Sequence, residues 1–156
     1  QLSWDWEQFS FKGRFEGEAL VHHYYAGIIQ GEASKADVPN LICRWLNWEG
    51  AQYFFHRPHE KVEFTPETLT PYWSNVAKIQ IHYAKQRYFL DQDGIMPALQ
   101  KIAEAQNVMG LCIQGGKDQV TPPTEIVDLR NAWPAIELKY LRDADHKIPD
   151  EEMLNL

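Results

Sequence analysis

The stretch "LCIQGGKDQVTPPTEIVDLRNAWPAIELKYLRDADH", residues 111–146, decides the fold class. Short apolar or alternating runs at each side of its centre predict strands at about 108–114 and 136–141. Between them, a segment with a proline pair at its first turn and Trp133-Pro134 at its end predicts a helix. Strand, helix and strand in this order form the unit of a parallel sheet, so the sequence predicts an α/β fold.

Two polar side chains follow these predicted strands. Asp118 comes after the first strand and His146 after the second. Open α/β sheets hold their active sites beyond the carboxyl ends of the strands, so we expect the two side chains to lie close together. A carboxylate that accepts from one ring nitrogen orients an imidazole and lets the other nitrogen take a proton from a nucleophile. The alternative interpretation is that Asp118 only caps the helix that follows.

The residues before this stretch have helical rather than strand periodicity. Apolar side chains at spacings of three and four predict helices within 14–30, from Pro39 to about His56, and at about 72–89 and 96–106. Proline in a first helical turn favours the start at Pro39. The apolar positions of that helix extend too far round it for a fully exposed surface helix.

The sequence therefore predicts two regions, a helical cap region at 1–106 and an α/β segment at 107–156. A two-stranded parallel sheet cannot stand alone, because both of its faces and both of its edges need covering. We expect the cover to come from a missing upstream half of the protein or from a second copy of the chain. The first residue is Gln1 rather than Met, which we take as a sign that translation began further upstream.

Composition and charge exclude several classes of protein. Apolar residues make up 44% of the chain and aromatic residues 13%, which is too much apolar surface for a disordered segment. The net charge of −7 with scattered acidic residues argues against nucleic acid as a partner. No apolar run is long enough to span a membrane, and Cys43 and Cys112 have no disulfide-framework spacing. We therefore expect a soluble, cytoplasmic protein with reduced thiols.

No cofactor or metal site is predicted. His56 and His59 lie close in sequence, but Pro58 breaks the helix between them and a third ligand is missing nearby. The glycine pair at 115–116 is not followed by the Lys-Ser or Lys-Thr of a phosphate-binding loop.

Three stretches resemble one known family. The segment 113–146 resembles the end of the proline iminopeptidase (prolyl aminopeptidase) family of α/β-hydrolases, where an apolar strand, a glycine, an acid, "DLxxAWP" and a histidine follow in this order. "RWLNWEGA", residues 44–51, resembles the tryptophan-rich cap helix of that family, and "AKIQIHYAKQRYF", residues 77–89, resembles the next cap helix. The resemblance implies a partial α/β-hydrolase fold, a helical cap followed by the last strand-helix-strand elements of a parallel sheet.

The resemblance also implies a substrate-binding role for Glu49, which matches a cap carboxylate that holds the free α-ammonium group of a peptide. The physical chemistry agrees, because Glu49 shares a helix face with Trp45 and Tyr53, and a carboxylate between aromatic rings suits an ammonium group. An ordinary salt bridge from Glu49 to Arg44 or Lys78 is the alternative.

By the same resemblance, Asp118 is the triad acid and His146 the general base. The second acidic residue of the family's cap corresponds to Gln80 here, and the small residue before the histidine is replaced by Asp145. A neutral amide at Gln80 attracts an ammonium group less than a carboxylate does, which leaves the preferred substrate open.

The sequence contains no Gly-x-Ser-x-Gly motif for a nucleophile. Its four serines, Ser3, Ser10, Ser34 and Ser74, lie in no predicted strand-to-helix turn. We therefore expect the nucleophilic serine and the oxyanion hole to lie upstream of this chain, and the chain alone to be inactive.

The leading hypothesis is the C-terminal part of a serine aminopeptidase that releases N-terminal proline or a similar residue from small peptides with a free N-terminus. One alternative keeps the capped α/β-hydrolase fold but makes the complete protein an esterase, for which Gln80 indicates a neutral substrate. The other is a non-catalytic helical module that associates with a second copy of itself.

Overall fold

The structure is a computed structural model that describes residues 2–105 and 108–147. The chain divides into two compact units between Phe89 and Leu90, and each unit is described by itself. The division of the sequence into a cap region at 1–106 and an α/β segment at 107–156 stays a prediction.

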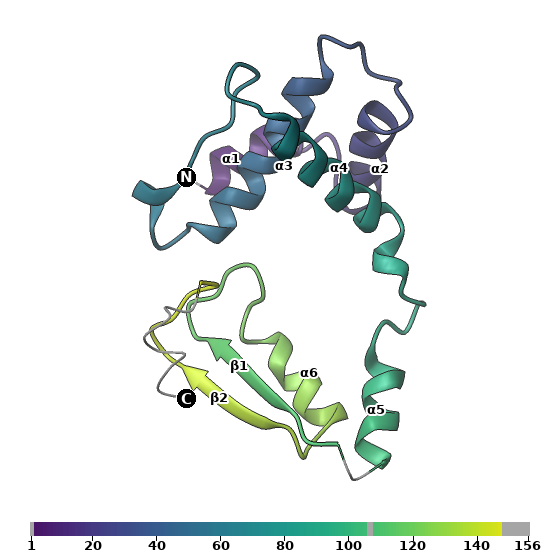
Figure 1. Ribbon diagram of the computed structural model, residues 1–156, viewed down its shortest axis with the longest axis vertical. Coiled ribbons are helices and arrows are strands. Elements are labelled where there is room, and N and C mark those ends of the chain that lie inside the picture. The colour runs from purple at the N-terminus through teal and green to yellow at the C-terminus, as the bar shows by residue number, and fades with distance from the viewer. Residues whose placement is uncertain (1, 106–107, 148–156) are drawn as a thin grey trace. The chain divides into compact units, whose positions relative to one another are not determined.

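The first unit is helical (Figure 1). In this unit α1 packs against α3, α2 packs against α4, and α3 also contacts both α2 and α4. Its elements are α1 (Leu2–Phe9), α2 (Gly17–Ile28), α3 (Val38–Tyr53), the 3-10 turn η1 (Pro58–Glu60), α4 (Pro71–Lys85) and the short turn η2 (Arg87–Phe89).

Local sequence signals set the ends of these helices. Pro39 lies in the first turn of α3 and Pro71 in the first turn of α4, where proline has no amide hydrogen to lose. The hydroxyl of Thr70 caps α4 by accepting from the amide of Trp73 at 3.4 Å. Gly31, with a φ of +77°, lies just beyond α2 in the left-handed conformation that glycine adopts without strain.

The core of the helical unit is rich in aromatic side chains. Tyr24 is fully buried, and its hydroxyl donates to the carbonyl oxygen of Phe9 at 2.8 Å. The ring of Phe9 stacks on Tyr24, with ring centroids 5.1 Å apart, and also on Trp48 at 5.4 Å. The buried cluster consists of Phe9, Leu20, Tyr24, Ile28, Leu41, Ile42, Trp45, Leu46, Ala77 and Ile81. Aromatic packing of this kind accounts for much of the burial in a small unit.

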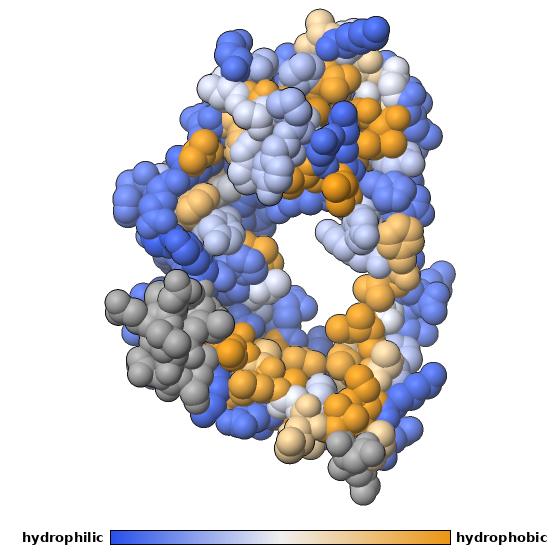
Figure 2. Space-filling model, in the orientation of Figure 1, coloured by the Kyte–Doolittle hydropathy of each residue, from blue (hydrophilic) through white to orange (hydrophobic). Residues whose placement is uncertain are grey.

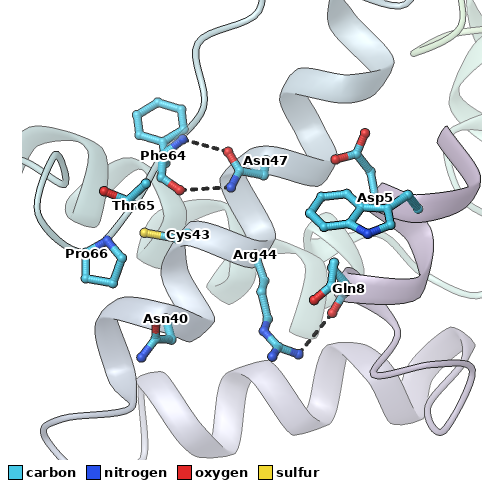
Figure 3. Close-up of a pocket in the computed structure, with 10 residues that line it drawn as sticks. Asp5, Gln8, Asn40, Cys43, Arg44, Asn47, Phe64, Thr65 and Pro66 are labelled. Atoms are coloured by element: carbon cyan, nitrogen blue, oxygen red, sulfur yellow. Dashed lines mark hydrogen bonds between the residues drawn. The ribbon is translucent and has the colours of Figure 1, made fainter. Parts of the chain in front are cut away.

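The connection between α3 and α4 is tied back to the helices at two points. The Nζ of Lys61 lies 2.9 Å from Oδ1 of Asp5 on α1, and both side chains are buried. The side-chain amide of Asn47 on α3 both donates to the carbonyl oxygen of Phe64 at 2.9 Å and accepts from its amide at 2.8 Å (Figure 3). A buried ion pair and a two-way amide contact therefore fix the path of this loop.

The second unit contains α5 (Met96–Glu104), β1 (Leu111–Gly115), α6 (Glu125–Ala132) and β2 (Glu137–Leu141). The two strands pair in parallel, with Leu111 opposite Glu137 and Gly115 opposite Leu141, and the helices α5 and α6 contact each other. The predicted strand-helix-strand order is confirmed.

Three predicted element ends are wrong. The helix from Pro39 ends at Tyr53, short of His56, and β1 begins at Leu111. The predicted helix at 72–89 ends at Lys85, because the next turn, Arg87–Phe89, has positive φ angles at all three residues. The predicted end of the fourth helix at Gln106 lies outside the described residues. No strand or helix was predicted for residues 2–9, where the structure has α1.

The sheet has only two strands within residues 2–105 and 108–147. Leu111 on β1, Tyr140 on β2 and Val127 on α6 each expose more than half of their surface. Figure 2 shows hydrophobic residues at the surface of this unit. Apolar surface on a short parallel sheet is typical of a sheet that is covered in a complete fold.

Candidate active site

The candidate active site lies on the two loops that follow the paired strands. Asp118 follows β1, which ends at Gly115, and His146 follows β2, which ends at Leu141. Gly115 and Leu141 are register partners, so both loops begin at the same edge of the sheet. This is the edge at which open α/β sheets place their active sites.

Backbone contacts hold the two loops together. The amide of Gly116 donates to the carbonyl oxygen of Leu141 at 2.8 Å, and the amide of Lys117 donates to that of Ala144 at 2.9 Å. These bonds continue the pairing of the strands into the loops, and they fix the backbone on both sides of the candidate site.

The glycine pair is needed for this close approach. A Cβ atom at Gly115 would lie 2.5 Å from the carbonyl oxygen of Asp145 and 2.7 Å from that of Ala144. A Cβ at Gly116 would lie 2.5 Å from the carbonyl oxygen of Arg142. Only residues without a side chain leave room for the second loop at these two positions.

The structure brings Asp118 and His146 into contact. The Nδ1 atom of His146 lies 3.0 Å from Oδ2 of Asp118 and 3.2 Å from Oδ1. The side chain of Asp118 is 8% exposed and that of His146 is 35% exposed. The expected proximity is therefore confirmed, and the catalytic role of each residue stays a prediction.

The carboxylate of Asp118 has three further hydrogen-bond donors. Its Oδ1 accepts from the amides of Val120 and Thr121 at 2.8 and 2.9 Å, and its Oδ2 accepts from the hydroxyl of Thr121 at 2.7 Å. Burial acts to raise the pKa of Asp118, but the bonds from Thr121, His146 and Val120 outweigh it and lower the pKa below the ordinary 3.8. The group is ionised at neutral pH and accepts from the histidine.

This arrangement fixes one nitrogen of the imidazole. With Nδ1 directed at an ionised carboxylate, the proton of a neutral imidazole belongs on Nδ1 and proton exchange with a reactant belongs on Nε2. An oriented, partly exposed imidazole with a buried carboxylate behind it can act as a general base and then as a general acid. Such a pair needs a nucleophile to activate.

In the helical unit, Trp45 and Gln80 are in direct contact. The indole Nε1 of Trp45 donates to Oε1 of Gln80 at 3.0 Å. Trp45 is 5% exposed, and its ring lies edge-on against Phe9 and Tyr24. Trp45 is therefore a core residue that orients the amide of Gln80, and the substrate-binding roles of both residues stay predictions.

Glu49 lies on α3 between Trp45 and Tyr53 in sequence, and it is half-buried. Burial raises the pKa of Glu49 above its ordinary value of 4.5. Within residues 2–105 and 108–147 no salt bridge forms between Glu49 and a Lys or Arg side chain. Arg44, which was one expected partner, instead donates to the carbonyl oxygen of Gln8 (Figure 3). Its guanidinium lies over the ring of Phe11.

Tyr53 is the last residue of α3 and is half-buried. Its ring is edge-on to Phe54, with centroids 4.8 Å apart, and the guanidinium carbon of Arg57 lies 5.9 Å from the ring centre. The helix therefore brings a carboxylate and an aromatic ring to neighbouring turns, as the spacing of Glu49 and Tyr53 predicts.

Two residues of the candidate site were not identified from the sequence. Thr121 provides two of the donors to Asp118, and Gln114 donates through Nε2 to the carbonyl oxygens of Gly115 and Thr121 at 2.9 and 3.0 Å. An available signal was the spacing Asp-x-x-Thr, which is typical of a turn closed by its own side chains.

The residues that could hold a metal ion or act as another nucleophile are few. In the part of the chain that the structure describes, no three His, Cys, Asp or Glu side chains gather as metal ligands would. Cys43 and Cys112 are free thiols, and burial raises the pKa of both, which disfavours the reactive thiolate.

Among the described helices, none combines the length and the hydropathy that a membrane span requires.

Comparison with known proteins found a relative that matches part of the chain. No protein-family model matches the sequence. A proline iminopeptidase from Xylella fastidiosa (strain Temecula1 / ATCC 700964) is 30% identical over 104 residues, which are 65% of this chain and 31% of that protein. The chain thus matches less than a third of the length of the relative. The similarity suggests a hydrolase-like relative, and the helices and small parallel sheet are compatible with a partial α/β fold.

Proposed function

We propose that this chain is the C-terminal part of a serine hydrolase that resembles proline iminopeptidase and releases N-terminal proline or a similar residue from small peptides. The observation that carries the proposal is the contact of 3.0 Å between His146 and Asp118 after two parallel strands. The similarity to a proline iminopeptidase supports the same reaction class.

In this proposal His146 takes the proton of a serine hydroxyl as the serine attacks the peptide carbonyl. The protonated ring then gives that proton to the departing amine, and the same steps with water release the acyl group. Asp118 stabilises the charged ring throughout. The serine and the oxyanion hole belong to an upstream part of the protein, because the motif Gly-x-Ser-x-Gly does not occur in this sequence.

Glu49 is proposed to bind the free α-ammonium group of the peptide. Its support is a half-buried carboxylate with a raised pKa and without a salt-bridge partner among the described lysines and arginines. A substrate cation would offset the cost of burying this charge, which an unpaired carboxylate bears alone. Tyr53 and the amide of Gln80 would line the same site.

The test is hydrolysis of a proline arylamide by the chain alone and by the chain mixed with the upstream fragment of the Xylella fastidiosa relative. We expect no turnover by the chain alone and turnover by the mixture. Turnover by the chain alone would refute the division of the triad between two parts.

Variants of the mixture test the proposed residues. Replacing the acid of a triad typically costs a factor of about 10⁴ in kcat, and replacing its base about 10⁶, so we expect losses of these orders for Asp118→Asn and His146→Ala. His59→Ala is the matched control, since His59 is an exposed histidine of the helical unit. Equal activity of His146→Ala and His59→Ala would contradict the proposed base.

The esterase alternative is favoured by one observation, the neutral amide of Gln80 where the resemblance implies a carboxylate. Glu49→Gln separates the two functions. If the complete protein is an aminopeptidase, this variant loses its preference for substrates with a free amino group over the same substrates blocked at nitrogen. An unchanged preference would remove the proposed role of Glu49.

The proposed partner is the upstream half of the hydrolase, which would cover the two-stranded sheet and the exposed Leu111, Val127 and Tyr140. Self-association is the competing interpretation. Solution mass distinguishes the two, because a dimer of the chain that persists in the presence of the upstream fragment supports self-association.

A further inference from the structure

The feature that goes beyond the Asp118–His146 pair is the side chain of Thr121. Both oxygens of the carboxylate accept from this one residue, Oδ1 from its amide at 2.9 Å and Oδ2 from its hydroxyl at 2.7 Å. Oδ1 accepts from the amides of Val120 and Thr121 and lies 3.2 Å from Nδ1 of His146, whereas Oδ2 is held by the hydroxyl and by Nδ1 at 3.0 Å. The hydroxyl is therefore the contact, besides the histidine, that sets the rotation of the carboxylate about its Cβ–Cγ bond.

The position of Thr121 is itself fixed by Gln114 on β1. Gln114 is 8% exposed, and its Nε2 donates to the carbonyl oxygens of Thr121 and of Gly115, the residue that follows Gln114. A buried amide with both hydrogens used holds one rotamer. The strand thus fixes the loop, and the loop in turn fixes the carboxylate.

We propose that Thr121 is a positioning residue that keeps the Asp118 carboxylate rotated toward Nδ1 of His146 and so maintains the proton of the neutral imidazole on Nδ1. Without the hydroxyl, the carboxylate can turn while Oδ1 keeps its two amide donors, and Nδ1 loses its nearest acceptor, Oδ2. The meaning of this role for catalysis rests on the proposed function, whereas the role itself concerns only groups of this chain.

The experiment measures the two neutral tautomers of His146 by nitrogen NMR of the full chain, labelled with ¹⁵N in histidine. His146→Gln identifies the ring signals that belong to His146. In Thr121→Val we expect the ratio of the Nδ1–H to the Nε2–H form to fall roughly fivefold, the effect of one ordinary hydrogen bond. Because Thr121 is an exposed residue, we expect a change in the tautomer ratio of this size and not a larger one.

The control variants separate positioning from folding. Thr121→Ser keeps the hydroxyl and is expected to restore the ratio, and Thr124→Val changes an exposed threonine of the same loop whose side chain makes no capping bond. Backbone amide shifts of β1 and β2 report whether each variant folds. If Thr121→Val does not fold, Thr121→Ala gives the same comparison without the added methyl group.

An unchanged ratio in the folded Thr121→Val or Thr121→Ala protein would overturn the proposal, as would a failure of Thr121→Ser to restore it. The same variants in the mixture with the upstream fragment give the catalytic readout, a fall in kcat with KM unchanged. If the tautomer ratio falls in Thr121→Val but the mixture with the upstream fragment shows no turnover at all, the positioning role stands and the proposed function is removed instead.

Discussion

Gly115→Ala tests the close approach of the two loops most directly. Its Cβ would lie 2.5 Å from the carbonyl oxygen of Asp145, and ordinary van der Waals contact begins at 3.4 Å. The second loop must therefore retreat by 3.4 Å minus 2.5 Å, about 0.9 Å. Because the atoms in the way are backbone, no side-chain rotation can relieve the contact, and we expect a loss of about 1–3 kcal/mol in the stability of the α/β unit.

The same retreat affects the candidate site. His146 follows Asp145 directly, so a full transfer of the movement would lengthen the Nδ1–Oδ2 distance from 3.0 Å to about 3.9 Å. A contact of that length is no longer a hydrogen bond. We expect the signal of the Nδ1 proton of His146 to broaden or vanish in Gly115→Ala.

The assay must report on the α/β unit alone. Of the six tryptophans only Trp133 belongs to this unit, so fluorescence would follow the helical unit instead. Amide hydrogen exchange of β1 and β2 measures the local stability directly. Gly50→Ala is the control, because its nearest contact would be a side-chain carbon of Lys61 at 4.0 Å, and alanine favours a helix. Unchanged exchange and an unchanged Nδ1 proton in Gly115→Ala would refute the reasoning.

Three further predictions concern stability. Because the pKa of Asp118 is lowered in the folded chain, its ionised carboxylate stabilises the fold at pH values above 3.8, the ordinary pKa of the group, and this contribution is lost as the pH falls through the lowered pKa. Asp118→Asn should therefore remove that part of the acid sensitivity, measured by amide exchange of β1 and β2. Lys61→Met leaves Asp5 buried without its cation and should cost about 3–5 kcal/mol in urea unfolding followed by tryptophan fluorescence. Tyr24→Phe removes the donor to the carbonyl oxygen of Phe9 and should cost about 1 kcal/mol by the same measurement.

Matched controls exist for these variants. Lys35→Met and Tyr83→Phe change exposed residues of the same unit, and each should alter the free energy of unfolding by less than about 0.5 kcal/mol. Equal effects of Lys61→Met and Lys35→Met would contradict the buried ion pair. If amide exchange of β1 and β2 responds to falling pH in the same way in the wild type and in Asp118→Asn, the contribution of the carboxylate is contradicted.

The sequence was sufficient for the order of the longer elements from α2 to β2 and for the position of the candidate site. Alternating apolar runs around a proline-flanked helix predicted two parallel strands, and parallel strands bring the segments that follow them to one edge. The proximity of Asp118 and His146 follows from this topology. Prolines and glycines at helix ends, such as Pro39 and Gly31, have purely local effects and could be identified in the same way.

The parts that the sequence did not reveal depend on tertiary contacts. Arg87, Tyr88 and Phe89 continue a helical pattern, but they adopt left-handed backbone conformations that only the surrounding structure selects. α1 is a short segment that becomes helical because its aromatic side chains pack on α3, rather than through helix propensity. The donation from Gln114 to the loop of Asp118 likewise depends on a three-dimensional contact.

The attachment of the loop between α3 and α4 at Lys61 and Phe64 has a consequence for the handling of the protein. Both attachment points are side-chain contacts to α1 and α3, so they do not require an unbroken backbone between the two helices. A single proteolytic cut after the exposed Glu60 would leave α1, α3 and the downstream piece joined noncovalently under native conditions. Denaturing electrophoresis of such a nicked sample would show two bands from a particle that migrates as one on gel filtration.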